Sequence, residues 1–125
     1  FRLPTEAEWE LAATGGKEQQ MPVSEIAWHS ANAQYQTQNV GKRRSNGFGL
    51  YDMLGNVWEW CWDWHGSYPS MSVVDPLGPE DGQRRVRRGG SWRNKAHQIR
   101  ITNRANSDPQ SSSSAYGFRV VRSSS

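Results

Sequence analysis

The sequence has a single cysteine, Cys61, and no long apolar run. One thiol cannot form an internal disulfide, nor can it supply the paired cysteines of a common type of zinc site. No stretch approaches the roughly 18 consecutive apolar residues of a membrane-spanning helix. These absences exclude a disulfide scaffold, a paired-cysteine zinc site and a helical membrane span within the 125 residues given.

Apolar residues are also scarce, at 34% of the chain. Seven tryptophans partly compensate, because each buried indole removes roughly 150–250 Å² from water. Twelve glycines and six prolines favour many turns over long helices and strands. Length and composition together predict one domain with a small core and much loop.

Acidic residues are almost missing from the C-terminal third. Residues 84–125 hold ten of the fifteen Lys and Arg residues but only one of the twelve acidic residues, Asp108. Such a segment can form a basic patch for an anionic partner such as nucleic acid, or it can pack against the acidic N-terminal part. The second interpretation is favoured, and no specific nucleic-acid partner is expected, because the arginines are spread singly and aromatic residues are not interleaved with them.

Local patterns predict one helix and a few short strands. Residues 5–14, "TEAEWELAAT", form a helix with Thr5 as its N-cap and Glu8 at the N3 position of a capping box. The alternation of "VWEWCWDW" is typical of a strand. "RRVRRGGSW" and "YGFRVVR" are predicted to be further short strands, and residues 17–47 and 65–83 are predicted to be loop.

Four ordered segments carry a family resemblance: "FRLPTEAEWELAA", "GFGLYDMLGNVWEWCWDW", "RVRRGGSW" and "GFRVVR". Together they resemble the signature segments of the formylglycine-generating-enzyme-like (sulfatase-modifying factor) family. The resemblance implies an α+β fold of the C-type lectin type, with short strands, few helices and long loops, as a single domain over residues 1–125. Family members usually carry a further N-terminal segment before the first helix, so the expectation is either a trimmed core or a missing part that lies on another chain.

The family includes oxidases, non-haem iron enzymes and binding proteins. Its oxidases hold copper on two cysteines a few residues after the Gly-Gly-Ser motif, whereas the matching stretch here, "SWRNKAHQIR", has none. Cys61 is expected to be a packed core thiol. The three histidines, His29, His65 and His97, lack the spacing of a facial iron site. A non-enzymatic protein is therefore expected, with a homologue of the oxidases or of the iron enzymes as the alternative.

The resemblance also implies a structural calcium ion. Its ligands would be the side chains of Asp52 and Glu59 and the backbone carbonyls of Gly55 and Val57. Hard oxygen ligands from one turn, two of them anionic, suit calcium. In the alternative interpretation Asp52 caps a turn and Glu59 pairs with an arginine from the C-terminal half. The sequence favours neither.

Residues 89–119 combine a regular frame with a polar filling. Gly89 and Gly90 permit a tight backbone before the segment, and Trp92 and Phe118 are expected to anchor it in the core. Three arginines of the frame are expected to bind carboxylates or carbonyls: Arg100, Arg104 and Arg119.

The filling of this frame is the candidate ligand-binding surface. In the variable proteins of diversity-generating retroelements, which belong to the same family, the C-terminal segment is hypermutated and displayed as a binding surface. The matching residues here are mostly small or polar: Arg93, Asn94, Lys95, His97, Gln98, Asn103, Asn106, Ser107, Gln110, Ser111, Ser112, Ser113, Ser114, Ala115 and Tyr116. The alternative is an ordinary solvated loop without a dedicated role.

Broad hydrogen bonding from a loop surface suits a macromolecule better than a small buried cofactor. We therefore expect a protein or glycan ligand on a cell surface, with a cell surface or a phage particle as the setting of the chain itself. The oligomeric state is left open. A third hypothesis is an anion-binding module that uses the basic C-terminal half.

Overall fold

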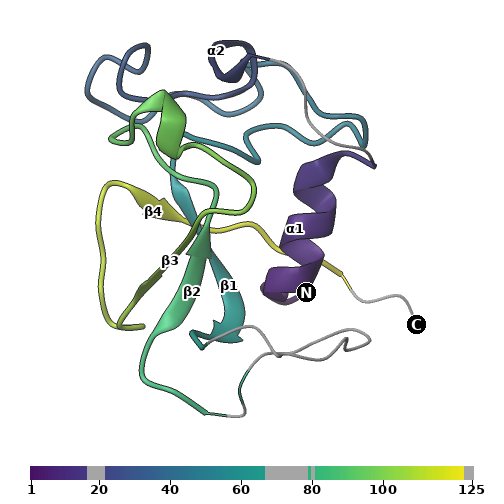
Figure 1. The fold of residues 1–125 in the computed structure, drawn as a ribbon, viewed down its shortest axis with the longest axis vertical. Helices are drawn as coiled ribbons and strands as arrows, with labels where there is room; N and C mark the ends of the chain where they lie inside the picture. Colours follow the sequence, from purple (N-terminus) through teal and green to yellow (C-terminus); the bar gives the residue numbers. More distant parts are fainter. Residues whose placement is uncertain (17–21, 67–78, 80, 123–125) are drawn as a thin grey trace.

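The computed structural model describes residues 1–16, 22–66, 79 and 81–122 (Figure 1). Most of the loop predicted over residues 65–83 lies outside them. The elements in chain order are α1 (Glu6–Thr14), α2 (Val23–Ile26), β1 (Trp58–Trp64), β2 (Arg85–Arg88), the 3-10 turn η1 (Ala96–Gln98), β3 (Arg104–Ser107) and β4 (Tyr116–Gly117). This α+β arrangement has the few helices, short strands and long loops that were predicted. No helix in the described part of the chain is long and apolar enough to cross a bilayer.

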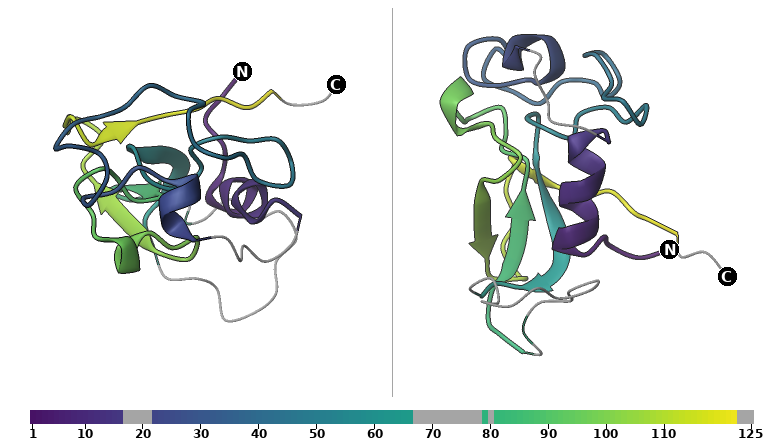
Figure 2. Two further views of the ribbon diagram at one scale, coloured as in Figure 1. Left: turned by 90° about the horizontal axis from the view of Figure 1, so that it is seen from above. Right: turned by 45° about the vertical axis from the view of Figure 1, so that its right-hand side comes forward.

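The four strands form one mixed sheet in the order β3-β2-β1-β4. β1 and β3 pair antiparallel with β2, whereas the short β4 pairs parallel with β1. α1 packs on one face of the sheet, against β1 and β2. Figures 1 and 2 show the connection from β3 to β4 on the opposite side from α1. The sheet therefore separates a helix-covered face from a face that lies beneath the polar C-terminal segment.

α1 begins and ends where local signals predict. The Thr5 hydroxyl accepts a hydrogen bond from the Glu8 amide (3.1 Å), and the Glu8 carboxylate accepts one from the Thr5 amide (2.8 Å). At the other end Gly15 takes a left-handed conformation with φ of 66°, which a residue with a side chain rarely adopts. The predicted capping box is confirmed.

A pH effect follows from the same cap. Hydrogen bonds from Arg2, whose guanidinium lies 2.6 Å from the Glu8 carboxylate, lower the pKa of Glu8 to about 2. A carboxylate whose pKa is lower in the folded than in the unfolded protein stabilises the fold at pH values above its unfolded pKa. This stabilisation is lost as the pH falls toward 2. We expect the urea midpoint of the wild type to fall more between pH 5 and pH 2 than that of Glu8→Gln. Equal falls in the two proteins would contradict the lowered pKa of Glu8.

The core lies between α1 and the sheet. Trp9, Cys61 and Val86 are almost completely buried there, at 1%, 0% and 0% exposure. The burial of Cys61 confirms the prediction of a packed core thiol, and it also raises the pKa of that thiol. Of the two side-chain sets of β1, the one with Glu59, Cys61 and Asp63 faces this core, and the tryptophan set faces the other way, with Trp62 51% exposed.

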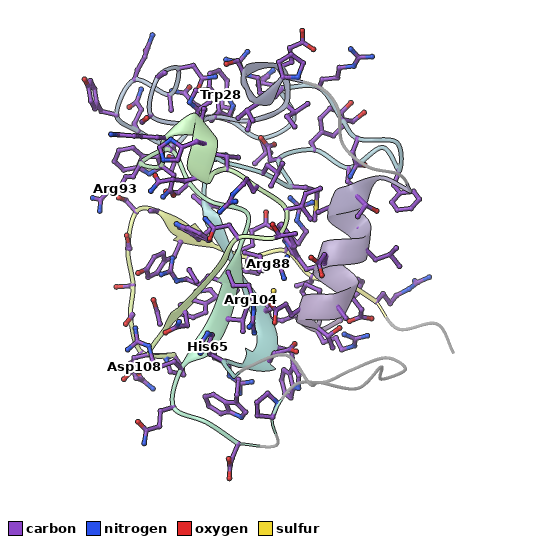
Figure 3. All side chains as sticks on the ribbon, in the orientation of Figure 1. Trp28, His65, Arg88, Arg93, Arg104 and Asp108 are labelled. Atoms are coloured by element: carbon purple, nitrogen blue, oxygen red, sulfur yellow. The ribbon has the colours of Figure 1, made fainter. Side chains whose placement is uncertain are left out.

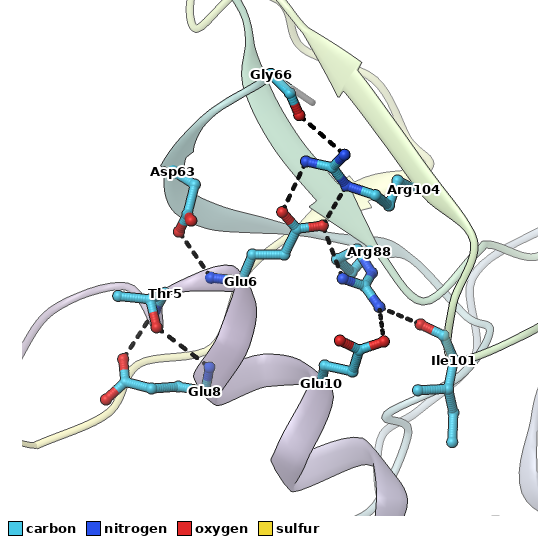
Figure 4. A network of polar contacts seen from close by, with 9 residues as sticks. All are labelled: Thr5, Glu6, Glu8, Glu10, Asp63, Gly66, Arg88, Ile101 and Arg104. Carbon is cyan, nitrogen blue, oxygen red and sulfur yellow. Dashed lines mark hydrogen bonds and ion pairs between the residues drawn. The ribbon is translucent and has the colours of Figure 1, made fainter. Parts of the chain in front are cut away.

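A buried cluster of charges joins α1 to the sheet (Figure 4). The Glu6 carboxylate binds both Arg88 (2.7 Å) and Arg104 (2.6 Å). Arg88, whose side chain is fully buried, also binds Glu10 (3.2 Å) and the Ile101 carbonyl. The expectation that the basic C-terminal part packs on the acidic N-terminal part is confirmed by these pairs.

One predicted anchor is wrong. Phe118 is 69% exposed, and Ile99, at 2%, is the deeply buried residue of the segment. The reason is the alternation of side chains along an extended chain. Because the Arg119 side chain turns inward to bind Glu59 (2.7 Å), its neighbour Phe118 points outward. The other predicted anchor, Trp92, is half-buried.

Candidate ligand-binding surface

Most of the predicted binding residues fall in two exposed segments. One is the turn of residues 93–98, which includes η1, and the other is the connection of residues 108–115 between β3 and β4. Figure 3 places Arg93 near the upper end of the face away from α1 and Asp108 near its lower end. The sheet therefore presents both segments on the same side of the molecule.

Trp92 ties the two segments together. Its indole nitrogen donates a hydrogen bond to the Ser114 carbonyl (3.1 Å), and the Arg93 guanidinium lies 4.9 Å from the centre of its ring. The Trp92 amide donates to the Asn56 carbonyl (2.8 Å) in the turn before β1. The tryptophan thus fixes the spacing of the segments without entering the main core.

Two polar side chains of the first segment shape its backbone. The Asn94 side-chain oxygen accepts hydrogen bonds from the Ser91 amide (2.9 Å) and hydroxyl (3.0 Å). The Gln98 side-chain oxygen accepts one from the Lys95 amide (2.9 Å). Three other side chains of the segment are exposed and form no hydrogen bond with the backbone of the described residues: Arg93, Lys95 and His97.

The second segment is held by backbone groups and by Asp108. The Asp108 carbonyl accepts from the Ser111 amide (2.9 Å), and the Asp108 carboxylate accepts from the Gln110 amide (2.9 Å). The Ser113 hydroxyl accepts from the Ala115 amide (3.1 Å). The side chains left exposed are those of Gln110, Ser111, Ser112 and Ser114.

Two predicted binding residues are buried and cannot meet a ligand directly. Ser107 and Ala115 are each 4% exposed. Ser107 lies at the end of β3 with its hydroxyl against the Tyr116 hydroxyl (3.2 Å), and the Ala115 carbonyl accepts the Trp58 amide (2.7 Å) where β4 begins. Asn103 and Asn106 lie at half-buried positions between the two segments, where Asn103 donates to the Gln98 carbonyl (2.8 Å).

Substitutions in the serine run test this division. We expect Ser112→Ala to change the free energy of unfolding by no more than about 0.5 kcal/mol, as at ordinary surface sites. Ser113→Ala removes the acceptor of the Ala115 amide and should cost about 1 kcal/mol. Urea denaturation of both variants is the measurement, and a larger cost at Ser112 than at Ser113 would contradict the assignment.

Sequence reasoning missed the aromatic and basic residues beneath the segments. The Arg87 guanidinium lies 4.2 Å from the Tyr116 ring centre, and Trp60 meets the same ring edge-to-face at 5.7 Å. Arg85 lies 3.7 Å above the Trp64 ring. The expectation that aromatic residues are not interleaved with the arginines is therefore wrong, because the fold brings aromatic rings against Arg85 and Arg87. The sequence contains a signal for this contact, because alternate residues of β1 and of β2 lie on one face of the sheet.

A family model described as a sulfatase-modifying factor enzyme 1-like domain matches residues 1–124. The chain belongs to this sulfatase-modifying factor family. The solved structure of Treponema denticola variable protein 1 is 40% identical and superposes with a TM-score of 0.86, over 94% of this chain and 45% of that one. The predicted fold, the C-type lectin type of this family, is thereby confirmed.

Curated relatives of the sulfatase-modifying factor domain differ in their names. Serine/threonine-protein kinase pkn1 of Chlamydia pneumoniae is 41% identical over 132 residues, which cover 97% of this chain and 21% of that protein. The formylglycine-generating enzyme of Thermomonospora curvata is 37% identical over 150 residues, which cover 96% of this chain and 48% of the enzyme. The chain thus spans half or less of these relatives, so their activities are not carried over with the fold.

Of the four calcium ligands implied by the family resemblance, the two side chains, Glu59 and Asp52, make contacts with other groups of the protein. Both Glu59 oxygens accept from Arg119 (2.7 and 2.8 Å), and one also accepts from the Trp9 indole (2.9 Å). One Asp52 oxygen accepts from the Gly41 amide (2.8 Å), and the other is buried without a hydrogen-bond partner. These contacts match the alternative interpretation, in which Asp52 caps a turn and Glu59 pairs with an arginine from the C-terminal half. The Glu59 charge is thus already compensated by Arg119, whereas one Asp52 oxygen has no hydrogen-bond partner.

Calcium binding by Asp52, Gly55, Val57 and Glu59 stays a prediction, which the Arg119 contact argues against. We expect the Tm to be the same in millimolar calcium chloride and in EGTA, because the Arg119 guanidinium already compensates the Glu59 charge. Differential scanning calorimetry is the measurement. A calcium-dependent rise in Tm that Asp52→Asn removes would restore the calcium site.

Proposed function

We propose that this chain is a non-enzymatic ligand-binding domain that displays a variable polar surface, as the variable proteins of diversity-generating retroelements do. The observation that carries the proposal is that Trp92 joins the two mostly exposed polar segments, residues 93–98 and 108–115, above the sheet. Rigid scaffolds that present adaptable polar loops are typical of binding proteins. The similarity to Treponema denticola variable protein 1 supports the same function.

The division of labour between side chains and backbone supports this function. The frame of the segments rests on Asn94, Asp108, Trp92 and backbone groups, whereas exposed side chains such as Lys95 and Ser112 make no bond that the fold requires. Exposed positions of this kind accept substitutions with little loss of stability. A surface of this design accepts a change of ligand without a change of fold.

The alternative, an oxidase of the formylglycine-generating type, finds little support in the residues. The chemistry implied for that enzyme needs two cysteine thiolates, and this chain has one cysteine, which is buried in the core.

We propose a protein or glycan at a cell surface as the ligand of the polar surface, and a cell surface or a phage particle as the location of the chain.

Sequencing of the codons for residues 89–119 in many sister isolates tests the proposal. The expected result is variation at exposed positions such as Arg93, Lys95 and Ser112, with Gly90 and Trp92 constant. Gly90 has φ of 74°, and an added Cβ would lie 2.6 Å from Ile99, so it serves as a built-in control. A uniform segment, or variation that includes Trp92, would overturn the proposal.

A further inference from the structure

Arg87 stands out on the face of the sheet away from α1. Its guanidinium lies 4.2 Å from the Tyr116 ring centre and 5.0 Å from that of Trp58. It donates one hydrogen bond, from a terminal nitrogen to the Asn106 carbonyl (3.3 Å), and its Nε is buried without an acceptor. A guanidinium has five N–H donors, so most of the donors of Arg87 are left for another group.

Three other buried or half-buried arginines of the C-terminal half have carboxylate partners, whereas the half-buried Arg85 donates to the Trp62 carbonyl instead. Arg88 and Arg104 bind Glu6, and Arg119 binds Glu59. For Arg87 no carboxylate lies within ion-pair distance among the described residues. Burial lowers the pKa of Arg87, and the nearby charge of Arg84 lowers it as well. The protein thus places a cation beside aromatic rings and a second cation, without a counter-charge of its own.

A desolvated charge without a partner is unfavourable, whereas one that meets an opposite charge gains a strong, directional pair. The planar fork of arginine fits a carboxylate with two parallel hydrogen bonds. The Tyr116 ring, which Trp60 meets edge-to-face, covers one side of the fork, and the exclusion of water there strengthens such a pair. The arrangement favours a ligand that brings a negative charge.

We propose that Arg87, Tyr116 and Trp60 form a subsite for an aspartate or glutamate carboxylate of an acidic protein segment. The inference rests on the proposed function, because Tyr116 and Asn106 belong to the surface described above. A protein segment is favoured over a glycan by the spacing of the cations. Arg85 and Arg87 lie two residues apart on one face of β2, at roughly 6–7 Å, which is the repeat of alternate side chains in an extended peptide.

A first experiment probes the subsite with acetate. Titration of the whole chain with sodium acetate, followed by the NMR signals of the Arg87 Nε–H and the Trp60 indole N–H, is expected to show saturable shifts. Arg87→Gln should abolish the Trp60 shift, whereas Arg122→Gln, at an exposed position next to the Arg2–Val121 bridge, should leave it unchanged. Sodium sulfate is the second arm, since tighter binding of sulfate than of acetate would assign the subsite to a sulfate or phosphate instead. Absence of a saturable shift with acetate would overturn the inference.

A second experiment separates the subsite from the binding function as a whole. The chain and its Arg87→Gln and Arg122→Gln variants are screened against a random peptide library and against a sialylated glycan array. The expected result is enrichment of peptides with alternate acidic residues, with binding at least tenfold weaker for Arg87→Gln and within twofold of wild type for Arg122→Gln. Peptides that bind independently of Arg87, or a preference for sialylated glycans, would overturn the acidic-segment inference and leave the binding function standing. Absence of any binder would count against both.

Discussion

Replacement of Arg88 by methionine is expected to lower the free energy of unfolding by about 3–5 kcal/mol, the range for breaking a buried ion pair. The Arg88 side chain is fully buried and binds Glu6, Glu10 and the Ile101 carbonyl at once. Methionine fills much of the space, but it leaves part of the buried charge on Glu6 without compensation and the Ile101 carbonyl without this donor. The cost is therefore electrostatic more than steric.

Urea denaturation followed by tryptophan fluorescence measures this effect. Arg100→Met is the matched control, because Arg100 is exposed, and it should change stability by no more than about 0.5 kcal/mol. A domain of this size has a total stability of about 5–15 kcal/mol, so Arg88→Met is expected to remain measurable or to unfold outright. Arg88→Lys keeps the charge but loses the fork and should fall between wild type and methionine. Arg88→Met as stable as Arg100→Met would show that the cluster contributes little.

The second large effect is expected at Trp9. This side chain is 1% exposed, lies beneath Arg88 and donates its indole hydrogen to Glu59 (2.9 Å). Trp9→Ala should cost about 3–5 kcal/mol, the range for large buried aromatics. The loss combines a cavity between α1 and the sheet with a weakened environment for the Glu59 carboxylate.

Trp62 offers a control of the same residue type. It lies on the opposite face of the sheet and is 51% exposed, so Trp62→Ala should cost no more than about 1 kcal/mol. Trp9→Phe keeps most of the apolar volume and loses the hydrogen bond, so its cost should be intermediate. Thermal unfolding by circular dichroism compares the three variants. Equal costs at Trp9 and Trp62 would mean that the core is not where the structure places it.

The sequence predicts those parts of the fold that local contacts determine. The limits of α1 follow from Thr5, Glu8 and Gly15, because each capping contact closes within a few residues. The family resemblance added the order of the segments and the fold type. The burial of Cys61 was also predicted correctly, because the segment "EWCWDW" is a structural position in the family that the chain resembles.

The features that failed depend on pairing between distant segments. Phe118 is exposed because Arg119 is drawn to Glu59, sixty residues away in the chain. Ser107 and Ala115 are buried because β3 and β4 place them against Tyr116 and Trp58. The stacking of Arg87 on Tyr116 likewise needs the parallel pairing of β4 with β1. No local pattern encodes these registers, so the candidate surface was located by its segment but not by its individual residues.

The contact between Trp92 and residue 114 has a genetic consequence. The indole donates its hydrogen bond to the backbone carbonyl of Ser114. Every amino acid has this group, so the hydrogen bond can form whichever residue the codon at that position encodes. At Ser111 the amide proton is the donor, and proline is the one residue that cannot supply it. Alleles that differ along this stretch would therefore share one fold. At residue 111, an allele that encodes proline would be the one most strongly selected against.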